Sequence, residues 1–244
     1  ESITSGHVQF IAHGMDDLSV PSTIDLTRLT TFTPDPTAFS SDRQSSLRAS
    51  DGGRIVGNVG LTSLRNVNLI VDGVGQLPTA QLSSYRDGTV SVNAGAVDLS
   101  RLATASTARF YVSGGATLEL PQLTSYAAGH SYEDLYLQAT GKGSVLDLGA
   151  VQTFSGNTDW NLLVRAIDGA EVRLGGVESI TSGHVQFIAH GMDDLSVPST
   201  IDLTRLTTFN PDATDPGSER QSGMIVTGGG WIQVGSVHSS VETG

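Results

Sequence analysis

One stretch of the sequence gathers residue types that bind or cleave polysaccharides. Paired carboxylates serve glycoside hydrolysis, and a tryptophan offers a large flat apolar face to a sugar ring. Two polar segments that follow consecutive apolar runs carry such residues: His130, Glu133, Asp134, Asp159 and Trp160. This set would suit a glycosidase or polysaccharide lyase, a carbohydrate-binding surface, or polar loops that shield the edge of a scaffold, and the spacing alone leaves all three open.

A second group of residues has the chemistry of a cation site. His13 is followed by Asp16 and Asp17, and the same run recurs with Asp193 and Asp194. Carboxylate oxygens are the ligands that calcium prefers, so these aspartates are weak candidates for a calcium site. The glycine-rich nonapeptide calcium repeat does not occur, and Asp-Gly pairs indicate turns first of all. We therefore expect no cofactor, with calcium as the one alternative.

The strongest signal in the sequence is an internal repeat. Residues 1–32 recur without a change at 178–209, an offset of 177 residues (178 minus 1). We expect one domain over 1–244, with one long unit at 1–177 and the start of the next copy at 178–244. The first residues match the middle of a repeat, so we expect a segment of a longer array. Duplication in whole copies is typical of a structural module, so we expect no catalysis.

A shorter unit lies inside the long one. Counting Ile24 as position zero, apolar residues fall at positions zero, plus two, plus five and plus eight. This frame begins at Ile24, Val56, Leu77, Val97, Leu118, Leu146, Val172, Ile201 and Ile232. The smallest spacings, 20 and 21 residues, define the minimal coil. An alternation of apolar and polar residues, often closed by glycine, precedes each frame and indicates a strand.

The plus-seven position of the frame is a hydroxyl residue in every copy. Its members are Thr31, Ser63, Ser84, Thr104, Ser125, Thr153, Ser179, Thr208 and Ser239. We expect a structural hydroxyl ladder, in which each side chain bonds a backbone group at a turn or its neighbour along the stack. The alternative is a regular binding surface for ice or polysaccharide.

Two short strands and a turn cannot bury an apolar face alone, but stacked copies can. The columns therefore predict an all-β fold, a parallel β-solenoid of about nine coils with essentially no helix. Coil lengths vary only after position plus eight and before position zero, so loop insertions should lie along two edges. A leucine-rich repeat has a similar period, but its asparagine column and its helix are not supported here.

The runs LTSLRNVNLIVDG, LELPQLTSY and VLDLGAVQTF resemble the tandem β-solenoid repeats of giant bacterial extracellular and surface proteins. The resemblance is one of class and covers the whole chain. It implies an extracellular or cell-surface location, a structural or adhesive role, and no catalytic residue. The partners it implies are further copies of the repeat, joined end to end or assembled into a filament, and polysaccharide.

Composition excludes several other functions. The chain has 13 basic and 25 acidic residues, a net charge of −12, and no cysteine. Nucleic acids and anionic membranes attract clustered positive charge, so neither is expected as a partner. No apolar run is long enough to insert into a bilayer. The leading hypothesis is a structural repeat module of a filament, stalk or surface protein, and the alternative is an adhesin or carbohydrate-binding module that acts through its edge loops.

Overall fold

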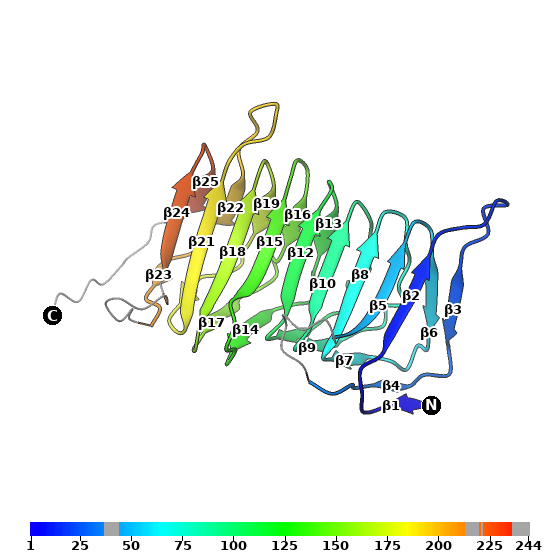
Figure 1. Ribbon diagram of the computed structural model, residues 1–244. Coiled ribbons are helices and arrows are strands. Elements are labelled where there is room, and N and C mark those ends of the chain that lie inside the picture. The colour runs from blue at the N-terminus through cyan, green and yellow to red at the C-terminus, as the bar shows by residue number, and fades with distance from the viewer. Residues whose placement is uncertain (37–43, 213–219, 221, 236–244) are drawn as a thin grey trace.

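The computed structural model describes residues 1–36, 44–212, 220 and 222–235 (Figure 1). These residues form 25 β-strands and no helix. Nearly all strand pairs are parallel, and the one named pair that runs antiparallel joins Asn157 to His184. The expectation of an all-β fold is confirmed. The paired strands belong to successive repeats, so residues that lie side by side are far apart in the sequence.

The strands form three rows, here called A, B and C. Row A contains β2 (Gln9–His13), β5 (Ser45–Ser50), β8 (Val67–Asp72), β10 (Thr89–Asn93), β12 (Arg109–Ser113), β15 (Leu135–Thr140), β18 (Asn161–Ile167), β21 (His184–His190) and β24 (Gly223–Thr227). Row B contains β7 (Ser63–Arg65), β9 (Ser84–Arg86), β11 (Thr104–Ser106), β14 (Ser125–Gly129), β17 (Thr153–Asn157), β20 (Ser179–Ile180) and β23 (Thr208–Phe209). Row C contains β13 (Thr117–Glu119), β16 (Val145–Asp147), β19 (Glu171–Arg173), β22 (Thr200–Leu203) and β25 (Trp231–Val234). Two further pairs are β1 (Ser2–Ile3) with β4 (Thr31–Phe32), and β3 (Thr23–Leu26) with β6 (Arg54–Gly57).

Each full repeat visits row A, then row C, then row B. The nine-residue frame therefore holds two strands, where we expected one strand and a turn. In the frame of Leu118 the chain turns after β13, where the N–H of Leu123 donates to the carbonyl of Leu120 at 3.1 Å, and then enters β14. The tight turn explains why both position plus two and position plus five can point inward although they are an odd number of residues apart.

The rows hold their register from repeat to repeat. In row A the buried column runs through Phe10, Leu47, Leu69, Val90, Phe110, Leu137, Val164, Phe187 and Met224. In row C the predicted zero positions align as Leu118, Leu146, Val172, Ile201 and Ile232. Branched and aliphatic residues suit such stacking on a pleated surface.

The second frame begins one residue earlier than predicted. Ile24 pairs with Ile55, which is buried, and not with Val56. The extra residue enters the turn that follows β6, where the N–H of Gly60 donates to Oδ1 of Asn58. The predicted start at Val56 fits the spacing to Leu61 but not this pairing, because the extra residue lies between Ile55 and Leu61.

Aromatic rings join rows A and B through the core. Ring centroids lie 6.5 Å apart between Phe110 and Tyr126 and 5.6 Å apart between Tyr126 and Phe154. The hydroxyl of Tyr126 donates to the carbonyl of Ala108 at 2.7 Å, and burial raises the pKa of this phenol. A buried tyrosine needs such a partner, and here the partner is the residue directly before β12, the row A strand that precedes Tyr126 in the chain.

Insertions leave the rows at two edges, in agreement with the expectation for the described residues. The loop at 14–22 joins β2 of row A to β3, and its twin at 191–199 lies between rows A and C and rises above the neighbouring turns (Figure 1). The loops at 130–134 and 158–160 lie between rows B and A. These are shorter than predicted, because β14 and β17 continue to Gly129 and Asn157.

Leu123→Asp tests which side of the frame faces inward. Leu123 is fully buried, so an aspartate there places an unpaired charge in the core and should lower the free energy of unfolding by more than ~4 kcal/mol. The neighbouring Gln122→Asp is the control, because Gln122 is exposed and should tolerate the charge. Urea unfolding and limited proteolysis of both variants measure the difference. Equal resistance of the two variants would mean that the faces are assigned wrongly.

Candidate functional site

The loops at 130–134 and 158–160 are fixed to each other by one buried side chain. Asn157 is fully buried at the end of β17. Its Nδ2 donates to the carbonyls of Ser131 (3.2 Å) and Glu133 (3.1 Å), and its Oδ1 accepts from the N–H groups of Ser131 (3.3 Å) and Asp159 (3.1 Å). All four bonds of this amide are used, so the two loops form one ordered surface.

Arg109 forms the floor beneath this surface. Its side chain is only 10% exposed, and its Nη2 donates to Oε2 of Glu133 at 3.2 Å and to the carbonyl of Asp134. Oδ1 of Asp134 in turn accepts from the backbone N–H and the Nδ2 of Asn161, at 3.1 and 3.2 Å. The hydrogen bond between the guanidinium of Arg109 and the carboxylate of Glu133 joins two charged groups, so it is stronger than one between neutral groups. It holds the loop before β15 against row A.

Aromatic side chains line the space that the loops enclose. Tyr132 is 84% exposed and Trp160 is 37% exposed, and they come from the two different loops. Tyr136 on row A also lines this space, and the guanidinium carbons of Arg109 and Arg165 stand 5.9 and 5.0 Å from its ring centroid. Cations at these distances from an aromatic ring attract it and help to hold it in place.

Together these side chains enclose an open groove of about 410 Å³, which we call the loop groove. It is lined by Arg109, Tyr132, Glu133, Asp134, Tyr136 and Trp160. A concave space that combines aromatic rings with a few convergent polar groups is the usual form of a small-ligand site.

The loop groove contains three of the five residues singled out in the sequence, namely Glu133, Asp134 and Trp160. The other two form a separate pair beside it: Nδ1 of His130 lies 3.2 Å from Oδ2 of Asp159 and 2.8 Å from Oγ1 of Thr158. The side chain of His130 is 81% exposed. The structure therefore divides the predicted set into groove residues and a surface pair.

Sequence reasoning missed Arg109, Tyr132 and Tyr136. Arg109 pairs with Thr89 on β10 and, through the register of β12 and β15, lies next to Tyr136. The alternation of apolar and polar residues in the row A strands could have indicated Arg109 and Tyr136, because both occupy outward positions of their strands. Tyr132 is a large aromatic in a polar loop, and this feature alone could have added it to the set.

The carboxylates of the groove already accept hydrogen bonds from the protein. Glu133 accepts from Arg109, and Asp134 from Asn161, so both carboxylates are held in a fixed orientation. These carboxylates can accept hydrogen bonds from the hydroxyl groups of a sugar whose ring lies against Trp160 or Tyr132.

The aspartates proposed as calcium ligands shape turns. Oδ1 of Asp16 accepts from the N–H groups of Leu18 and Val20 at 2.9 and 2.8 Å, and Asp193 makes the same two bonds in the second copy. Asp194 lies 3.7 Å from Nζ of Lys142, and the side chain of Asp17 is exposed. Nδ1 of His13 points to Ser50 and Asp51. Within the described ranges, no cluster of three or more such side chains is arranged to hold a metal ion.

The predicted hydroxyl residues align along row B from repeat to repeat. Ser63, Ser84, Thr104, Ser125, Thr153, Ser179 and Thr208 pair in one continuous register along row B. Thr31 pairs with Ser2 in the separate pair of strands, and Ser239 lies outside the described residues.

In the part of the chain that the structure covers, these residues are exposed, except for the partly buried Ser84 and Thr208, and their hydroxyls bond no protein group. The plus-six hydroxyls carry out the predicted role instead. Thr30, Ser83 and Thr207 donate to the carbonyls of Glu1, Thr62 and Glu178, at distances of 3.1 to 3.3 Å.

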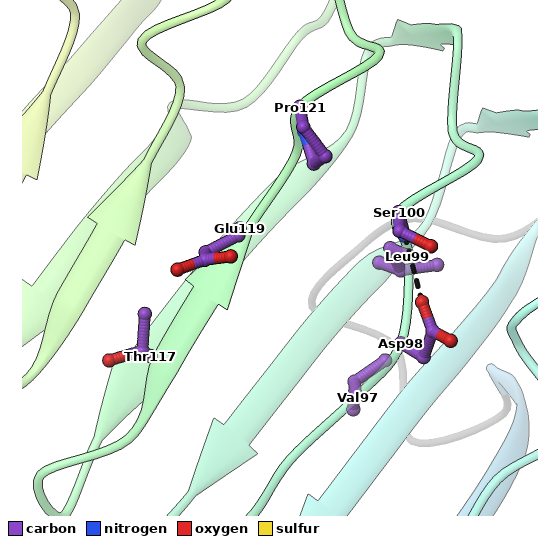
Figure 2. A pocket seen from close by; sticks show the side chains of 7 residues that line it. All are labelled: Val97, Asp98, Leu99, Ser100, Thr117, Glu119 and Pro121. Carbon is purple, nitrogen blue, oxygen red and sulfur yellow. Dashed lines mark hydrogen bonds between the residues drawn. The ribbon is translucent and has the colours of Figure 1, made fainter.

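A second hollow, of about 270 Å³, lies on the row C side (Figure 2). Asp98, on its wall, accepts a hydrogen bond from the N–H of Ser100 at 3.0 Å. Bonds from the side chain and backbone of Ser100 lower the pKa of this carboxyl. Asp25, Asp147 and Asp202 make the same turn in other repeats. Asp98 therefore stabilises a turn of the repeat. We therefore take the loop groove as the candidate site.

Comparisons with known proteins add no assignment. Neither protein-family models, nor curated proteins, nor solved structures match this chain. A separate search of the described residues finds no helix that is long and apolar enough to cross a membrane.

Asn157→Ala should release both loops. The substitution leaves buried backbone groups of Ser131 without partners, which costs ~1–3 kcal/mol for each such group. Trp160 should then become more accessible to acrylamide quenching, measured in a Trp231→Phe background so that one tryptophan is observed. Gln152→Ala removes the same kind of amide from an exposed position and should change neither stability nor quenching. Unchanged quenching in Asn157→Ala would show that another contact orders the loops.

Proposed function

We propose that this chain is a parallel β-solenoid of about nine coils that serves as a structural repeat module of a long extracellular filament, stalk or surface protein, without catalysis. One observation carries the proposal: nine strands of row A pair in parallel and in one register, from β2 to β24. Rows B and C repeat the pattern with the same direction of pairing. A molecule built this way is held by contacts between neighbouring repeats, so it can be extended without a new core.

The surface of the molecule fits such a role. Row B presents an unbroken column of small hydroxyl side chains to solvent, and the chain carries a net charge of −12. A hydroxyl-rich acidic surface remains soluble and repels other copies laterally, so growth is favoured along the direction of stacking. This supports a rod-like element that spaces other parts of a surface protein. The resemblance to repeats of giant bacterial surface proteins supports the same proposal.

Electron microscopy of the native source tests it directly. Strands stacked ~4.8 Å apart would make the nine coils ~43 Å long and advance one seven-coil unit by ~34 Å. We expect rods with an axial period near this second value, and a meridional reflection near ~4.8 Å from oriented samples. Compact particles without an axial period would overturn the proposal.

A second function is favoured by the loop groove. The loops of two consecutive repeats are ordered into one concavity in which Trp160 is exposed, as a carbohydrate-binding surface would need. The groove is lined by one arginine and two carboxylates, so it carries a net negative charge and suits a neutral glycan better than an acidic one. The module would then contact polysaccharide while it spaces the array.

Removing the groove aromatics tests this second function. Trp160→Ala and Tyr132→Ala should each raise the Kd for a bound glycan by roughly tenfold or more, since exposed aromatic anchors contribute most to such contacts. Trp231→Ala is the control, because Trp231 is 61% exposed but lies on β25, away from the groove. Dextran, microcrystalline cellulose and alginate are the probes, and binding is followed by pull-down and calorimetry. If none of them binds, or if the control variant loses binding equally, the groove is not a glycan site.

A further inference from the structure

The chain contains its own internal control, a 32-residue segment in two environments. Phe187, Ile201 and Leu203 of the second copy are fully buried, whereas Phe10, Ile24 and Leu26 of the first copy are only partly buried. On the same strands Ile11 is 52% exposed, whereas its twin Ile188 is partly buried. Since residues 1–32 and 178–209 are identical in sequence, this difference comes only from what is packed against them.

The second copy is covered by the repeat that precedes it. β21 pairs with β18 over seven residues, in which Val164 faces Phe187. β22 pairs with β19, where Val172 faces Ile201, and β20 pairs with β17. The covering residues therefore lie within 153–177, and they supply both hydrogen bonds and apolar contacts.

The first copy lacks this cover. β2, β3 and β1 are the terminal strands of their sheets, and each pairs on one side only within the described residues. Such an edge presents free N–H and C=O groups beside an apolar column, which makes it a template for another strand. We call the surface formed by β1, β2 and β3 the open face.

We infer that the open face binds a repeat with the sequence of residues 142–177, carried by a second copy of the long unit. The inference rests on the proposed repeat-module function and names its joining surface. Seven residues of β18 would pair with β2 as they pair with β21, and Val172 would cover Ile24. Identical sequences that bury the same side chains form the same complementary surface, so no new interface has to be assumed.

Details outside the strands agree with this partner. Lys142 lies 3.7 Å from Asp194, whose twin Asp17 has no such cation near it in the described chain. The N–H of Gly169 donates to Oγ of Ser199 at 2.9 Å, and Ser199 is fully buried, whereas its twin Ser22 is exposed. The partner repeat would satisfy both groups of the first copy.

The reactivity of a single introduced cysteine measures how well its position is covered, because the chain has no cysteine of its own. In the full chain, the thiol of Phe10→Cys should react readily with Ellman's reagent, and that of Phe187→Cys should react only on unfolding. We then extend the full chain by placing a second copy of residues 1–177 before Glu1. In the extended chain, labelling of the internal Phe10→Cys should slow by ~100-fold or more, because reaction now requires local opening. Unchanged labelling would overturn the inference.

A damaged partner provides the matched control. When Val164→Asp is placed in the added copy only, Phe10→Cys should remain reactive. If rods with the expected axial period are seen while the thiol stays reactive in the intact extension, the repeat-module function stands and the joining surface is wrong. If protection is found but the native source shows no rods, the surface is right and the filament function is wrong.

A glycine pair gives a second measurement that does not depend on a cysteine. Gly6 and Gly183 both have positive φ, +78° and +72°, so a side chain strains the backbone equally at the two positions. A Cβ at Gly183 would lie 2.4 Å from the backbone carbon of Gly156, whereas one at Gly6 meets no atom within 4 Å. Gly183→Ala should therefore destabilise the full chain more than Gly6→Ala. In the extended chain Gly6→Ala should become equally harmful, and a persistent difference would contradict the inference.

Discussion

Everything in this structure depends on parallel backbone pairing between neighbouring repeats. Parallel ladders require each strand to lie in the same register as the one before it, and a slip of one residue would turn the apolar column outward. Row A keeps that register over all nine of its strands. The second repeat shows how strictly it is enforced: its extra residue is absorbed in the turn around Asn58, and Ile55 still pairs with Ile24. Length therefore varies only where the chain leaves a row.

The loop groove is a consequence of this constraint. Two consecutive repeats carry extra residues between rows B and A, so their loops emerge one strand apart and must pack on each other. Asn157 makes that packing specific because all four hydrogen bonds of its amide are formed with the two loops. Arg109 anchors the loop at 130–134 to row A. A concave surface thus arises on a regular scaffold without any change to its core, and loops are where such variation is usually tolerated.

The two copies of residues 1–32 show how far burial is decided by neighbours. The same phenylalanine is fully buried at position 187 and partly buried at position 10, because only the former has a repeat on both sides. In repeat proteins stability is divided between the unit and its interfaces, so a terminal unit is always the weaker one. The contribution of the interface between repeats is here seen within a single chain, as the difference in burial between the two copies.

The sequence by itself determined the all-β class, the phase of the apolar columns, the alignment of the hydroxyl ladder and the edges at which loops leave. These follow from periodicity, and periodicity is a property of the chain alone. Only the tertiary structure decided that the frame holds two strands, that the ladder hydroxyls face solvent, and that Glu133, Asp134 and Trp160 share a groove with Arg109 and Tyr136. The reason is physical: these residues belong to different repeats, and their distances depend on how loops fold against a neighbouring strand rather than on any spacing along the chain.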